Sequence, residues 1–111
     1  MNEKQLNAAT QAMVKWLSDK HELGKAPNKM ECAGVFDYHE MHYYIFKYKV
    51  SIFGKWLVGV CGGFEGDDLM PCGHIFSERQ IYNETTAQSD CIKMIEMVME
   101  YWKRQAKAYG K

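Results

Sequence analysis

Residues 41–53 read MHYYIFKYKVSIF, and this stretch decides the fold because its side chains change character at every second position. One set of alternate positions is almost entirely aromatic or branched, which predicts a strand face covered by helices. That set comprises His42, Tyr44, Phe46, Tyr48, Val50 and Ile52. The other set is mixed and predicts a face that meets water; it comprises Tyr43, Ile45, Lys47, Lys49 and Ser51.

The segments on either side predict an antiparallel sheet around this strand. Residues 31–38 form the expected first strand, joined to the central one by a turn over residues 37–40. Gly54 marks the next turn, and residues 55–64 return as a third strand. Three glycines at positions 59, 62 and 63 predict a bulge or the close approach of another backbone. Residues 65–73 form an expected loop, and residues 74–77 add a short fourth strand.

A helix is predicted at each end of the chain. In residues 2–23, Asn2 followed by Gln5 resembles a capping box, and apolar residues recur at three- and four-residue steps. The second helix is expected to begin near Thr85 or Thr86, with Thr85 and Gln88 as its capping box, and to run to about residue 108. One apolar stripe on it comprises Cys91, Ile95, Val98, Trp102 and Ala106, and a second comprises Met94, Met97 and Tyr101.

These patterns predict an α+β fold of order α-β-β-β-(β)-α. A chain of 111 residues has the usual length of one domain, so we expect a single domain over residues 1–111. We expect two layers, with an antiparallel sheet of three to four strands and both terminal helices packed on it. The element order resembles that of small interaction proteins, such as secretion chaperones and immunity or adaptor proteins, but no motif in the chain selects one of them.

The charge balance predicts which partners the chain avoids. Fourteen basic and fourteen acidic residues leave no net field to attract nucleic acid or an anionic membrane, and they make self-association easier. The first residues lack the apolar core of a signal peptide, and no apolar run approaches the ~18 residues that span a bilayer. We therefore expect a cytoplasmic protein with reduced thiols and no membrane partner.

A metal- or thiol-dependent enzyme is one alternative function. Cys61, Cys72 and His74 are ligands that zinc accepts, and a thiol beside an imidazole is also the beginning of a nucleophilic site. Zinc sites usually show two tightly spaced ligand pairs, whereas this chain shows only the step from Cys72 to His74. The spacing favours inert thiols, and we expect no cofactor, with zinc as the alternative.

A single-stranded nucleic-acid binder is the second alternative. Tyr43, Lys47 and Lys49 share the outer face of the central strand, and Lys55 follows the next turn. Rings interleaved with cations on an open sheet are one way in which proteins stack bases. The neutral charge and ordinary cross-strand packing of tyrosine argue against this reading.

The doubled stripe on the second helix carries the leading hypothesis. One sheet face can receive only one of the two stripes, so the other needs the first helix, a partner chain or a ligand. We therefore expect a non-enzymatic protein-binding or adaptor module. We expect it to form a homodimer through Met94, Met97 and Tyr101.

Overall fold

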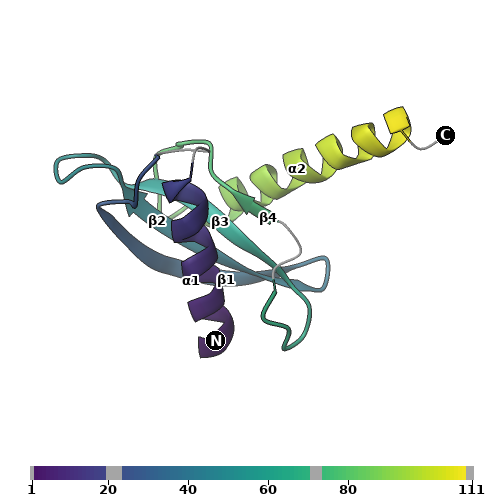
Figure 1. The fold of residues 1–111 in the computed structure, drawn as a ribbon, viewed down its shortest axis with the longest axis horizontal. Coiled ribbons are helices and arrows are strands. Elements are labelled where there is room, and N and C mark those ends of the chain that lie inside the picture. The colour runs from purple at the N-terminus through teal and green to yellow at the C-terminus, as the bar shows by residue number, and fades with distance from the viewer. Residues whose placement is uncertain (1, 20–23, 71–73, 110–111) are drawn as a thin grey trace.

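The computed structural model describes residues 2–19, 24–70 and 74–109, and it confirms the predicted class and element order (Figure 1). Two helices and a four-stranded antiparallel sheet follow one another along the chain. They are α1 (Glu3–Ser18), β1 (Lys29–Tyr38), β2 (Met41–Lys49), β3 (Leu57–Phe64), β4 (His74–Phe76) and α2 (Ala87–Tyr109). The strands lie in sequence order, β1-β2-β3-β4, so each pairs with its neighbour in the chain.

The two helices lie on opposite faces of the sheet, so the molecule has three layers rather than the two predicted. Ala9, Met13 and Leu17 of α1 pack on one face, against a cluster that includes Tyr44, Phe46, Tyr48, Cys61 and Phe64. The N-terminal part of α2, which contributes Ala87, Cys91, Met94 and Ile95, packs on the other face. Successive side chains of a strand point to opposite faces, and here both sets contain enough apolar residues to need cover.

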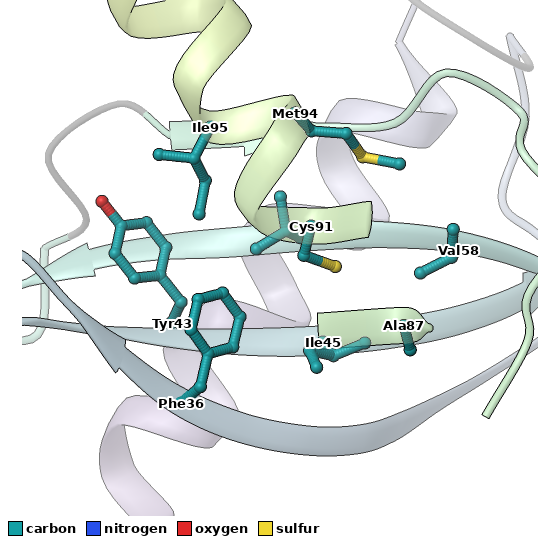
Figure 2. Packing of buried hydrophobic residues seen from close by; sticks show 9 residues of the cluster. Phe36, Tyr43, Ile45, Val58, Ala87, Cys91, Met94 and Ile95 are labelled. Atoms are coloured by element: carbon teal, nitrogen blue, oxygen red, sulfur yellow. The ribbon is translucent and has the colours of Figure 1, made fainter. Parts of the chain in front are cut away.

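The face of β2 that was predicted to meet water is instead buried beneath α2. Tyr43 and Ile45 are buried and contact Phe36, Val58 and Val60 of the neighbouring strands. Figure 2 shows Cys91, Met94 and Ile95 of α2 lying against this layer. Only the Lys47 end of this face extends beyond the start of the helix, which explains why the sequence of the face looked mixed.

Several element boundaries differ from the predictions. The strand β2 ends at Lys49 rather than at residue 53, because residues 51–54 form a turn in which the Gly54 N–H donates to the Ser51 carbonyl at 3.0 Å. Ile52 is therefore exposed rather than part of a covered strand face. The helix α1 ends at Ser18, and residues 20–23 of the predicted helix lie outside the described residues.

The predicted helix caps are partly confirmed. Asn2 caps α1, where its Oδ1 accepts from the Gln5 N–H at 3.1 Å, but the Gln5 side chain does not return to Asn2. The helix α2 begins at Ala87, and the predicted Thr85–Gln88 box is not its cap. Thr86 precedes the helix instead, and its hydroxyl donates to an Asp90 carboxylate oxygen at 2.9 Å.

The glycines of β3 confirm the predicted bulge, and Gly62 also confirms the close approach of another backbone, that of β2. The register of β2 and β3 shifts between His42 and Tyr43, and Gly63 in the bulged segment has a φ of +82°. A Cβ at Gly59 would lie 2.3 Å from the Met13 side chain, so α1 approaches the sheet there through a side chain rather than through backbone. These contacts fix α1 across the middle of β3.

Candidate functional site

The thiol of Cys61 is enclosed in the core beneath α1 and is unsuited to catalysis. Cys61 is fully buried, and burial raises the pKa of its thiol to about 12. A nucleophile or metal ligand needs the thiolate, which this environment disfavours. Cys72 lies outside the described residues, and His74 is placed only by its backbone, which pairs with Gly62. Within the described ranges, no group of three or more His, Cys, Asp or Glu residues is placed to hold a metal ion.

We expect Cys61 and Cys91 to resist alkylation in the folded protein at neutral pH and to react when the chain is unfolded. Burial raises the pKa of both thiols from 9.0 to about 12. Between pH 9 and about pH 12 these two thiols lose their protons in the unfolded chain but keep them in the folded chain. The free energy of unfolding should therefore fall as the pH rises above about 9. Mass spectrometry after iodoacetamide treatment, with and without urea, measures the reactivity. Rapid native labelling of Cys61 would contradict the burial argument.

The surface required by the nucleic-acid alternative is open only at its lysine end. Tyr43 is fully buried beneath α2, and its ring stacks on Phe36 with centroids 5.4 Å apart. The ammonium groups of Lys47 and Lys49 lie over the Trp56 ring, 4.8 and 5.0 Å from its centroid. The prediction that Tyr43 lies on an outer face is therefore wrong, because α2 covers the central part of that face.

The first half of α2 lies on the sheet, and it contains one of the three predicted interface residues. Met94 is only 1% exposed and belongs to the core with Ala87, Cys91 and Ile95. It lies three positions after Cys91 and next to Ile95, so it falls within the arc of the helix that meets the sheet. The expectation that Met94 contributes to a free stripe is wrong for this reason.

The second half of α2 extends past the edge of the sheet and carries large apolar side chains into solvent. Figure 1 shows this half projecting from the body of the molecule as a single rod. Met97, Tyr101 and Trp102 are 52%, 59% and 62% exposed. Trp102 lies seven positions after Ile95 and therefore on the same side of the helix. Ile95 is buried against the sheet, whereas Trp102 lies beyond the point where the sheet ends. We call Met97, Val98, Tyr101 and Trp102 the α2 surface.

Charged residues beside the α2 surface are ordered along the helix. Lys93 precedes Glu96 and Glu100, and Lys103, Arg104 and Lys107 follow them. A shallow hollow beside Met97 and Tyr101 is also lined by charged side chains, those of Lys93, Glu96, Glu100 and Arg104. Glu100 and Arg104 lie 3.7 Å apart and are both exposed, so they remain available to a partner. The second half of α2 therefore combines apolar anchors with charges of both signs.

A second hollow was missed by the sequence reasoning. A cavity of about 240 Å³ at the start of α1 is lined by Asn2, Gln5, Val35, Phe36, Asp37, His42, Tyr44, Gly66 and Asp67. His42 Nδ1 lies 2.6 Å from an Asp37 carboxylate oxygen, because these two residues pair across the β1–β2 hairpin. The predicted turn over residues 37–40 placed Asp37 inside the turn, whereas the strands remain paired as far as Tyr38 and Met41. Among the described residues of the lining there is no Ser, Thr or Cys nucleophile for this pair to activate.

Comparison with known proteins yields no relative: no family model matches the chain, and no curated protein or solved structure shows significant similarity to it. Among the described residues, no helix is both long and apolar enough to cross a membrane. A function for this chain must therefore be argued from its own surfaces.

Proposed function

We propose that this chain is a non-enzymatic protein-binding module that self-associates through the α2 surface. The observation that carries the proposal is the projection of the second half of α2, which leaves Met97, Tyr101 and Trp102 without cover from the described chain. An exposed group of large apolar side chains on one element is typical of an interaction site. The buried, inert Cys61 supports a binding role over thiol or metal chemistry.

The residue types on the α2 surface suit a contact that supplies binding energy. Tyrosine and tryptophan are enriched at the residues that dominate protein interfaces, and methionine adapts to different partners. Covering a side chain of this size removes apolar area worth roughly 1.5–3 kcal/mol. A two-fold contact covers three such anchors on each copy, and a helix that is already formed loses little order on association.

A second copy of the same chain is the partner that the charges favour. In an antiparallel pair of α2 helices, Glu96 and Glu100 of one copy face the basic segment 103–107 of the other. A two-fold axis generates this arrangement from a single surface, whereas a parallel pair would bring like charges together. The neutral net charge removes repulsion between copies. We also place the module in the cytoplasm, where its cysteines stay reduced.

We expect the double variant M97K/Y101K to shift the protein from dimer to monomer, with at least a ~100-fold weaker dimer affinity, because two anchors are lost and four like charges meet. Sedimentation equilibrium measures this shift. The matched control is the double variant L69K/M70K, which places the same two charges on another exposed apolar pair. The control should remain dimeric. Equal dimer affinity in M97K/Y101K and the wild type would exclude the α2 surface as the contact.

A further inference from the structure

The loop between β2 and β3 exposes two large apolar side chains at its tip. Phe53 is 98% exposed and Ile52 is 68% exposed. The Ser51–Gly54 turn holds them at the outermost point of the loop, where the described chain offers no packing partner for the Phe53 ring. Two adjacent large side chains exposed at one tip form an apolar patch, which makes this tip a candidate contact site.

Basic side chains gather around the base of this tip. Lys29 and Lys49 are paired across β1 and β2, Lys47 lies one step further along, and Lys55 directly follows the loop. Glu31 lies 3.5 Å from Lys47, and Glu78 and Glu84 flank the segment that pairs with Trp56 and Leu57, so acidic residues are also present at this end. Trp56 lies beneath Lys47 and Lys49, so an amphipathic ring lies between the apolar tip and the sheet.

The opposite end of the sheet is acidic, which explains how a chain of zero net charge contains a basic end. The β1–β2 turn and the loop after β3 hold Asp37, Glu40, Glu65, Asp67 and Asp68. Fourteen basic and fourteen acidic residues therefore cancel in the total but not in space. An argument from net charge alone, which predicted no membrane contact, overlooks this separation.

We propose that the β2–β3 loop attaches the protein to an anionic membrane surface. Phe53 and Ile52 enter the boundary between headgroups and acyl chains, while Lys29, Lys49 and Lys55 contact anionic headgroups. Trp56 takes the interfacial position that tryptophan prefers. An apolar tip with a tryptophan and lysines at its base fits a lipid interface better than a flat protein surface.

The proposal does not depend on self-association through α2. Figure 1 shows the β2–β3 loop at the end of the molecule opposite to the projecting half of α2, so an α2-paired dimer leaves both loop tips free. A single small tip gives weak, reversible binding, and two tips that reach the same membrane would strengthen it through avidity. The interaction should also weaken as salt rises, since part of it is charge attraction.

Co-sedimentation of the full chain with vesicles tests the proposal. The wild type should bind vesicles of phosphatidylcholine with phosphatidylserine roughly 100-fold more strongly than vesicles of phosphatidylcholine alone, given three basic contacts. Phe53→Ser should lower binding to the anionic vesicles about tenfold or more, because the apolar insertion is lost. Met70→Ser, at another highly exposed apolar position, is the matched control and should bind like the wild type. Thermal unfolding of each variant confirms that these exposed positions leave the fold intact.

Three outcomes would overturn the proposal. The first is no binding of the wild type to anionic vesicles, and the second is equal binding by Phe53→Ser and the wild type. The third would assign the basic end to nucleic acid. In that case a single-stranded oligonucleotide binds the wild type and Phe53→Ser but not Lys55→Glu, and none of these proteins binds the vesicles. Loss of vesicle binding in both Phe53→Ser and Lys55→Glu, with Met70→Ser unaffected, is the result that supports membrane attachment.

Discussion

Replacing Gly62 by alanine is expected to prevent stable folding or to cost at least ~3 kcal/mol of unfolding free energy. A Cβ at this position would lie 2.7 Å from the His42 carbonyl oxygen and 2.7 Å from the Tyr43 Cα. Both atoms belong to the backbone of β2 at the point where the strand register shifts, so neither can move without breaking the pairing with β3. Tyr43 also anchors the α2 layer, so its displacement would disturb the core.

Urea unfolding followed by circular dichroism measures the effect of Gly62→Ala. Gly34→Ala is the matched control, because its added Cβ meets only the Ile45 side chain at an ordinary distance of 3.7 Å. That variant should stay within about 1 kcal/mol of the wild type. Similar unfolding midpoints for the two variants would show that the β2–β3 bulge is not as tightly packed as described.

Replacing Gln5 by alanine is the second large expected loss, at about 3 kcal/mol. Its Nε2 donates to the carbonyl oxygens of Gly66 and Asp68, each at 2.7 Å, and its Oε1 accepts from the Tyr44 hydroxyl at 3.1 Å. Gln5 is almost fully buried, so its removal takes these hydrogen bonds from the Gly66 and Asp68 carbonyl oxygens and from the Tyr44 hydroxyl. The first turn of α1 would then no longer hold the loop after β3.

The same urea titration tests this prediction with two controls. Gln11→Ala on the exposed side of α1 removes a glutamine without buried contacts and should change stability by less than ~0.5 kcal/mol. Tyr44→Phe removes only one of the three hydrogen bonds and should fall between the other two variants. A Gln5→Ala variant as stable as Gln11→Ala would mean that the side chain does not fasten the loop.

The fold was largely predictable because alternation and helix periodicity are local signals. The three-layer arrangement was not, because β2 carries apolar residues on both faces at its centre and lysines on one face only at its end. In the sequence, this face combines apolar and charged residues, namely Tyr43, Ile45, Lys47 and Lys49, and so it looks mixed. The structure separates that face in space, since α2 covers Tyr43 and Ile45 and leaves the lysine end open.

The candidate surfaces were predictable only in part, for a related reason. The doubled stripe of α2 indicated excess apolar surface, but periodicity cannot show where the sheet ends beneath a helix. Met94 therefore looked equivalent to Met97, although one is buried and the other is exposed. The exposed Phe53 was missed because the alternating pattern continued through residue 53, whereas the backbone leaves the sheet after Lys49. The Asp37–His42 contact required the exact hairpin register.

The central claim, that the α2 surface joins two copies of the chain, is tested most directly by native mass spectrometry of the untagged wild-type protein. Each chain has a mass of 12.9 kDa. The proposal predicts a main species of two chains at micromolar concentration, which separates into single chains when M97K/Y101K replaces the wild type. A wild-type protein that remains a single 12.9 kDa chain at every concentration measured would contradict the claim.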